Sequence, residues 1–237
     1  MNNNLKQIIY RLDFDTRNNE DIVYNDEFLN TIMKSYKKVE IDEIENVGTL
    51  NVNKQNPNGL FNNEQVISKV FTNAEGTSQL KINKNCLIFN SIIFNENLKE
   101  SFKDIVDNFI KFNVSKSIIR IGLRKIYVYE NYKTSQLKEP LKIIMKERDL
   151  TNSIRLSRAI VREEYINDDI RITLNEGLLN PTYPSAIEDR SLIIDVDAVH
   201  YGIVNNSVDI KTIFDKSENS INAIKEKNIL EEGQLNE

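Results

Sequence analysis

Short runs rich in alternating apolar residues recur along this chain, and turn-forming residues separate them. Three such runs, at 66–72, 79–82 and 86–93, are separated by Asn73-Ala74-Glu75-Gly76 and by Asn83-Lys84-Asn85. Alternation with a period of two predicts strands, and short connections that contain Asn or Gly predict hairpins. The sequence therefore predicts antiparallel sheet.

Other segments predict further strands. They are 5–14, 116–128, the stretch around Leu141, Ile143 and Met145, 170–174 and 192–198. Segment 153–165 fits a helix about as well as a strand, and we favour a strand because Asn167-Asp168-Asp169 is a natural turn. Between residues 46 and 63 the chain is rich in Asn and contains Asn56-Pro57-Asn58-Gly59, so we expect an exposed loop there.

One predicted strand changes its alternation midway. Apolar residues stand at Ile119, Ile121 and Leu123, and then at Ile126 and Val128. An extra residue in a strand shifts a period-two pattern by one position. This shift predicts a β-bulge near Arg124-Lys125.

Three segments have the i, i+3, i+4 spacing of an amphipathic helix. They are 28–36, capped by Asn25 or Asp26, then 98–110, and 210–224. The predicted class is α+β, with antiparallel sheets and about three covering helices. We expect an N-terminal α+β lobe at 1–113 and a β-rich lobe with a terminal helix at 114–237, either as two similar lobes or as one continuous domain.

Composition narrows the class of protein. Of the 237 residues, 40% are hydrophobic and 28% are charged, which argues against disorder as the main state. No apolar run approaches the roughly 18 residues of a membrane span, and no secretory leader pattern opens the chain. Cys86 is the only cysteine, which excludes an intramolecular disulfide. We expect a cytoplasmic protein that does not associate with membranes.

No catalytic constellation stands out in the sequence. His200 is the only histidine and ends a predicted strand, without a Gly-x-Ser-x-Gly motif nearby, so we expect a local hydrogen bond. Cys86 lies in an apolar strand, where a cysteine usually behaves as a small hydrophobe. Neither a Walker loop nor a dinucleotide-binding glycine fingerprint is present, and no cofactor is expected.

Asp195 and Asp197 are the candidate metal ligands. Alternate residues of a strand share one face, so these two carboxylates converge and suit a hard divalent cation. Asp13 and Asp15 have the same spacing, however, and such pairs are common on solvated strand faces. We therefore favour a solvated face and keep a divalent metal as the alternative.

The net charge of -5 is unevenly distributed. Residues 116–172 carry 13 basic and 8 acidic residues, and the rest of the chain is correspondingly acidic. Candidates for anion or partner binding in this segment are Arg120, Arg124, Lys125, Arg155, Arg158 and Arg162. Aromatic residues are not interleaved with them, so pairing within the fold is favoured over a nucleic-acid site.

The run Arg120-Ile121-Gly122-Leu123-Arg124-Lys125-Ile126-Tyr127 resembles a strand motif, Arg-x-Gly-Leu-Arg-Tyr-Ile-Asn, of a sporadically distributed family of uncharacterised bacterial proteins. Segments 80–91 and 192–197 look similar to that family as well. Lys125 and Tyr127 depart from the motif, whereas Arg120, Gly122, Leu123, Arg124, Asp195 and Asp197 match the pattern. The C-terminal half also looks like the Sec-pathway export chaperone fold. The patchy distribution of the family implies mobile or accessory genes, such as toxin-antitoxin or phage-defence loci.

The leading functional hypothesis is a non-catalytic interaction module, acting as an adaptor or as an antitoxin-like or chaperone-like subunit of an accessory system. It implies a protein partner, for which a neighbouring gene is a candidate source, and leaves a homo-oligomer open. The first alternative is a metal-dependent enzyme that cleaves phosphoesters with Asp195 and Asp197, using Arg120 and Arg124 as anion clamps. The second alternative is a protein that binds nucleic acid or another anion through the basic segment.

Overall fold

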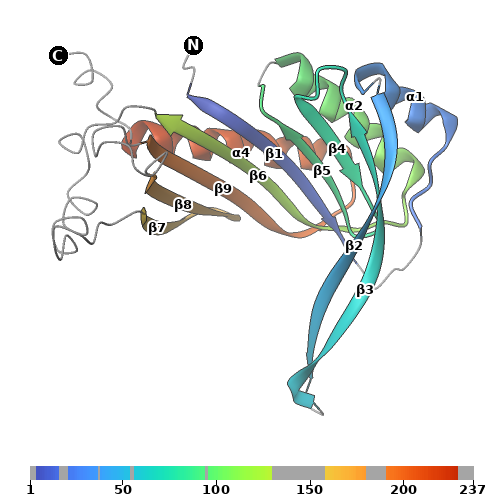
Figure 1. The fold of residues 1–237 in the computed structure, drawn as a ribbon, viewed down its shortest axis with the longest axis horizontal. Helices are drawn as coiled ribbons and strands as arrows, with labels where there is room; N and C mark the ends of the chain where they lie inside the picture. The colour runs from blue at the N-terminus through green and yellow to red at the C-terminus, as the bar shows by residue number, and fades with distance from the viewer. Residues whose placement is uncertain are drawn as a thin grey trace, which may run out of the picture.

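The computed structural model describes residues 4–15, 21–36, 38–53, 56–93, 96–129, 158–179 and 191–228. These residues form one antiparallel sheet and three helices, which is the α+β class that the sequence predicts (Figure 1). The strands are β1 (Leu5–Phe14), β2 (Lys38–Asn53), β3 (Asn56–Thr72), β4 (Ser78–Ile82), β5 (Cys86–Ser91), β6 (Ile118–Tyr129), β7 (Arg158–Asn167), β8 (Ile170–Leu179) and β9 (Ser191–Val204). The helices are α1 (Asp26–Ser35), α2 (Glu96–Phe112) and α4 (Ser207–Asn228).

The strand order shows how the two halves of the chain are related. Across the sheet it is β2-β3-β4-β5-β1-β6-β9-β8-β7. The first strand of each half, β1 or β6, lies at the centre, and the later strands of that half extend outward to one edge. Each half ends with a helix, α2 or α4. Among the described residues, the two halves thus share this order of strands within a single continuous sheet, although the first half has one more strand and the additional helix α1.

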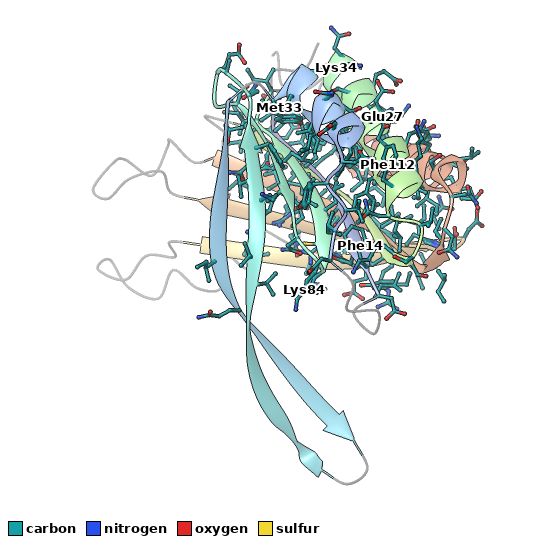
Figure 2. The ribbon with its side chains drawn as sticks, turned by 90° about the vertical axis from the view of Figure 1, so that its right-hand side faces the viewer. Phe14, Glu27, Met33, Lys34, Lys84 and Phe112 are labelled. Carbon is teal, nitrogen blue, oxygen red and sulfur yellow. The ribbon has the colours of Figure 1, made fainter. Side chains whose placement is uncertain are left out.

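The described helices all cover the same face of the sheet (Figures 1 and 2). On α1, Phe28 and Ile32 are fully buried, and Asn25 caps the helix by accepting a hydrogen bond from the Phe28 N–H at 2.8 Å. An aromatic cluster joins the two halves of the chain beneath α2 and α4. It contains Tyr10, Phe89, Phe102 and Phe214, with ring centroids 5.1–5.9 Å apart in contacting pairs. The three helices that periodicity predicts are therefore confirmed.

The prediction of an exposed loop at 46–63 is wrong. β2 and β3 pair from Lys38 opposite Thr72 to Asn53 opposite Asn56, so most of that segment lies in a long hairpin. The asparagines occupy ladder positions because the backbone groups of the partner strand satisfy their N–H and C=O groups. Val, Thr and Phe residues between them favour extended backbone, which outweighs the turn preference of isolated Asn residues.

The predicted β-bulge near Arg124-Lys125 is also wrong. Pairing continues through both residues, to Ile9 and Ile8 on β1 and to Asp197 and Val196 on β9. The apolar alternation in the sequence shifts here because Lys125 occupies a buried position on the helix-covered face, where an apolar residue would have continued the pattern. An irregularity does occur nearer the start of the strand, between Ile118 and Arg120. It places Ile118 in the core and leaves Ile119 36% exposed.

The strand at the start of the chain and the hairpins at 73–76, 83–85 and 167–169 are confirmed. Segment 153–165 contributes its described part to β7, as the favoured strand interpretation predicts. The strand expected around Leu141, Ile143 and Met145 lies outside the described residues. None of the helices in the described part of the chain has the length and apolar content that a bilayer span requires.

Candidate functional site

The face of the sheet opposite the helices carries a set of ion pairs across β1, β6 and β9. Its members are Arg11, Asp13, Arg120, Arg124, Asp195 and Asp197, which we call the arginine–aspartate ladder. The strand register brings them together, because Asp13 lies opposite Arg120 and Arg124 lies opposite Asp197. Alternate residues on neighbouring strands thus share this face.

Arg124 makes the strongest contact in the ladder. Its Nε donates to Asp195 Oδ1 and its Nη2 to Asp195 Oδ2, both at 2.7 Å. This two-pronged geometry matches a planar guanidinium to a carboxylate. The hydrogen bond with Asp195 raises the pKa of Arg124, outweighing the opposite effect of partial burial. Arg124 therefore stays charged and engaged by its own chain.

Asp13 accepts hydrogen bonds from two arginines, whereas Asp197 has only a longer contact with Arg120. Arg120 Nη1 donates to Asp13 Oδ2 at 2.8 Å, and Arg11 Nε donates to Asp13 Oδ1 at 2.7 Å. Asp197 Oδ2 lies 3.8 Å from Arg120 Nη2. Burial raises the pKa of Asp197, and the attraction of Arg120 and Arg124 only partly opposes that effect. Asp197 is the least well compensated carboxylate of the ladder.

The predicted site residues lie in different parts of the sheet. Arg120, Arg124, Asp195 and Asp197 share one face, as the sequence predicts, and they pair with one another. Lys125 lies on the opposite face, and Arg162 lies exposed on the edge strand β7, where it pairs with Glu164 at 2.8 Å. Arg155 lies outside the described residues, and Arg158 is described only as the first residue of β7. The basic segment therefore does not form a single cluster among these residues.

The roles of Arg11 and Asp13 in the ladder were not predicted from the sequence. Their alternation in the first predicted strand was a usable signal, because residues two apart in a strand share a face. The residues around β6 do not indicate which distant strand pairs with it.

Metal binding at Asp195 and Asp197 would have to compete with guanidinium groups. Within the described ranges, no group of three or more His, Cys, Asp or Glu side chains is placed to hold a metal ion. A hard cation needs several oxygen ligands, and Asp195 already uses both oxygens to accept hydrogen bonds from Arg124. The arrangement suits structural pairing of the strands better than cation binding.

His200 and Cys86 each contact a polar residue of a nearby turn. His200 Nδ1 lies 2.9 Å from Asp169 Oδ2, at the β7–β8 turn. Cys86 is buried, its Sγ lies 3.4 Å from Asn83 Oδ1, and burial raises its pKa to about 11. Cys86 therefore lacks the exposed, low-pKa setting of a reactive thiol.

A second ion-pair cluster lies under the helices. Lys125 Nζ donates to Glu218 Oε1 at 2.6 Å, and Lys99 Nζ donates to Glu218 Oε2. These residues come from β6, α2 and α4, so one carboxylate ties two helices to the centre of the sheet. All three side chains are at most 16% exposed.

The β2–β3 hairpin extends well beyond the body of the sheet. β3 pairs with β4 only from Lys69 to Thr72, whereas β2 and β3 continue to pair as far as Asn53 and Asn56. We call residues 41–53 and 56–68 the arm. Figures 1 and 2 show the arm leaving the sheet as a two-stranded ribbon. On it, Ile44 and Ile67 lie opposite each other and are 68% and 62% exposed.

Comparisons of the chain with protein-family models, with curated proteins and with solved structures found no match.

Proposed function

We propose that this protein is a non-catalytic protein-binding module that engages its partner through the arm. The observation that carries the proposal is the extent of the β2–β3 pairing, which continues far beyond the last pair with β4. Val66 and Ser68, at the base of the arm, are buried, whereas farther out β2 and β3 pair only with each other among the described strands. A two-stranded ribbon of this kind is at best marginally stable in water. A binding partner would supply the missing strand or the missing face.

The exposed isoleucines support the same proposal. Ile44 and Ile67 form a cross-strand apolar pair where the arm leaves the sheet. Cross-strand pairs of β-branched residues stabilise a sheet when they are covered. Here more than half of each residue is exposed, so the pair is available to be covered by a partner.

The ladder favours this proposal over the two alternatives. A phosphate or nucleic-acid backbone would have to displace Asp195 from Arg124 and Asp13 from Arg120. A catalytic divalent cation would have to displace the same arginines from the carboxylates. Both alternatives therefore start from ion pairs that must first be broken.

The family resemblance suggests the setting in which the module acts. A sporadically distributed bacterial family implies an accessory system, such as a toxin-antitoxin or phage-defence locus. We therefore propose a cytoplasmic adaptor, antitoxin-like or chaperone-like subunit whose partner is encoded by a neighbouring gene. The order of four strands and one helix in the second half is consistent with the proposed likeness to the export chaperone fold.

The experiment tests whether capture of a partner protein depends on the arm. Glu45 lies opposite Val66, so replacing residues 46–65 by Asn-Gly joins a matched pair through a two-residue turn. Tagged full-length and arm-shortened proteins are expressed with the neighbouring genes and compared by quantitative mass spectrometry. We expect a neighbour-encoded protein to be depleted at least tenfold with the shortened arm, while the melting temperature is maintained.

Two outcomes would contradict the proposed function. Either the full-length protein is recovered as a monomer without a partner, or a neighbour-encoded partner binds equally well to the arm-shortened protein. If the arm-shortened protein melts at a lower temperature, the variant Ile67→Asp is used in its place, because it alters the exposed isoleucine pair and leaves the hairpin intact.

A further inference from the structure

We propose that this protein forms a two-fold symmetric dimer in which β7 pairs with the β7 strand of a second copy of the chain. Among the described strands, β7 is the last at the edge of the sheet away from the arm, and it pairs with β8 alone (Figure 1). Its outward N–H and C=O groups can therefore accept one more strand. The inference concerns a different edge from the arm and does not depend on the proposed protein-binding function.

The two faces of β7 have different surroundings. Val161 and Tyr165 pack against the buried core. Asn167 donates a hydrogen bond to Ser220 of α4 at 2.8 Å. These alternate residues therefore belong to the helix-covered face. The residues between them lie on the opposite face, which the register aligns with the ladder.

Exposed side chains follow one another along that opposite face of β7. In order they are Ile160, Arg162, Glu164 and Ile166. The two isoleucines are 47% and 77% exposed. Arg162 Nη2 donates a hydrogen bond to Glu164 Oε1 at 2.8 Å, and these two side chains are 62% and 55% exposed. The order along the strand is thus apolar, positive, negative, apolar.

This order is complementary to itself when two copies pair antiparallel. With the two-fold axis at Glu163, Ile160 lies opposite the second copy's Ile166. Arg162 then lies opposite the second copy's Glu164, and symmetry makes each of these pairs occur twice. β-Branched pairs and opposite charges both stabilise a sheet when they are directly opposite. Each charge also has its opposite beside it along its own strand, so the charges form a closed alternating group.

The same charges select a second copy over an unrelated strand. Charged residues on an edge strand usually prevent pairing, because an unmatched strand leaves them without a counter-charge. Shifting the symmetric register by one step in either direction would place Arg162 opposite itself or Glu164 opposite itself. Of these three registers, only the one centred on Glu163 matches each charge on this face. The edge therefore discriminates between its own copy and other extended segments.

The helix-covered face adds one unfavourable pair and two favourable ones. The axis places Glu163 opposite the Glu163 of the second copy, and like charges in direct opposition destabilise a sheet. On each side of that pair, Val161 lies opposite the second copy's Tyr165, which is a favourable combination of a β-branched and an aromatic residue. Tyr165 Oη donates to Glu163 Oε2 at 2.6 Å and so holds the carboxylate within its own chain. Glu163 thus marks the register of the dimer.

The experiment measures the oligomeric state of the full-length protein by sedimentation equilibrium over a range of concentrations. We expect a reversible equilibrium between monomer and dimer. Arg162→Glu and Glu164→Arg each place two like-charged pairs across the interface, so each variant alone should dimerise at least tenfold more weakly. Both positions are exposed, so neither change should affect folding.

Mixing the two charge-reversed variants provides an internal control. One variant then carries two acidic residues and the other two basic residues at these positions, so the pairs across the interface match again. The heterodimer should be at least tenfold tighter than either homodimer, which an unfolded variant could not produce. Glu100→Arg, at a 66% exposed position on α2, makes the same change in charge as Glu164→Arg and should leave dimerisation within about twofold.

A second measurement locates the two-fold axis. The Cα atoms of directly opposite residues are about 4.5–5.5 Å apart, a separation that a disulfide can span. In a Cys86→Ser background, Glu163→Cys should therefore form a covalent dimer under mild oxidation. Lys216→Cys, exposed on α4, should not. Glu163→Gln removes the opposed carboxylates and should tighten the dimer a few-fold.

Several outcomes would overturn the proposal. They are a protein that stays monomeric at every concentration, a dimer that neither charge reversal weakens, and no recovery when the two variants are mixed. Assemblies larger than a dimer would also contradict it, because pairing of β7 with itself closes after two copies. Equal cross-linking of Glu163→Cys and Lys216→Cys would show that the axis lies elsewhere. The arm-shortened protein should still dimerise, so failure of the dimer and failure of the arm-dependent function are separate results.

Discussion

Lys125 lies in the buried face of β6 and donates a hydrogen bond to Glu218 of α4 at 2.6 Å. Its position would hold an apolar residue in a simple alternating strand. The ammonium group is accommodated because Glu218 neutralises it, and Lys99 of α2 binds the other carboxylate oxygen. A charged cluster thus fixes both long helices against the centre of the sheet.

Replacing Lys125 should destabilise the fold. Lys125→Met keeps the length of the side chain but leaves Glu218, 16% exposed, with Lys99 as its remaining ammonium partner in the cluster. Removing one member of a buried ion pair is costly because the other charge stays desolvated. We expect a loss of about 2 kcal/mol in the free energy of unfolding, measured by urea denaturation. The control, Lys216→Met on the exposed side of α4, should change it by less than about 0.5 kcal/mol. Equal stability of Lys125→Met and the unchanged protein would contradict the structural role.

Acid should weaken the fold partly through Glu218. Burial alone would raise the pKa of Glu218, but hydrogen bonds from Lys125 and Lys99 outweigh burial and lower it below its ordinary value of 4.5. The unfolded chain therefore binds the proton more readily, and this contribution is fully present above pH 4.5. It is lost as the pH falls below that value towards the folded pKa. Urea denaturation from pH 7 to pH 3 should show a shallower loss of stability for Glu218→Gln, and an unchanged slope would count against the prediction.

Local patterns were sufficient to predict much of the fold. α2 follows from its apolar stripe at helical spacing, and the β3–β4 and β4–β5 hairpins follow from Asn-containing turns between short strands. Each of these features depends on residues that are close in sequence. Pairing of basic residues within the fold, which the sequence favours, is seen for Arg120, Arg124 and Arg162.

Other features depend on contacts between distant segments. Lys125 and Glu218 are separated by 93 residues, and Arg124 and Asp195 by 71, so no local pattern reveals that they meet. The bulge was expected because Lys125 takes the buried position that follows Leu123 on its face, whereas Ile126 and Val128 on the other face are apolar. The arm was missed because Asn-rich segments are typical of turns when judged locally, whereas here their backbone pairs along the partner strand.

The two aspartates of β9 should respond differently to neutralisation. Asp195→Asn breaks the two-pronged contact with Arg124, which is 44% exposed, and should cost about 1 kcal/mol. Burial raises the pKa of Asp197 despite the attraction of Arg120 and Arg124, so its ionised form opposes folding at pH 7. Asp197→Asn should therefore leave stability unchanged or raise it slightly. Urea denaturation at pH 7 compares the two, and a larger loss for Asp197→Asn than for Asp195→Asn would contradict this reasoning.

Divalent cations should not stabilise the protein through the ladder. Arg124 and Arg120 occupy the carboxylates of Asp195 and Asp13, so Mg²⁺ or Mn²⁺ would gain oxygen ligands only by breaking those contacts. We expect either ion at millimolar concentration to change the melting temperature by less than about 1 °C, since weak binding contributes little by mass action. Asp195→Ala serves as the matched variant. A rise of several degrees that disappears in Asp195→Ala would restore the metal-dependent alternative.

Cys86 should be unreactive in the folded protein. Burial raises its pKa to about 11, with smaller opposing contributions from Arg11 and Lys81, and the residue is 6% exposed. At pH 8 only about one thiol in a thousand is ionised, and the thiolate is the reactive form. With Ellman's reagent we expect one thiol per chain to react promptly in 8 M urea, and reaction in buffer to be at least about 100-fold slower. Prompt modification in buffer would show that β5 opens readily or that the thiol is accessible, and would contradict its burial beside Asn83. Cys86→Ser, which lacks the thiol, gives the background rate for both conditions.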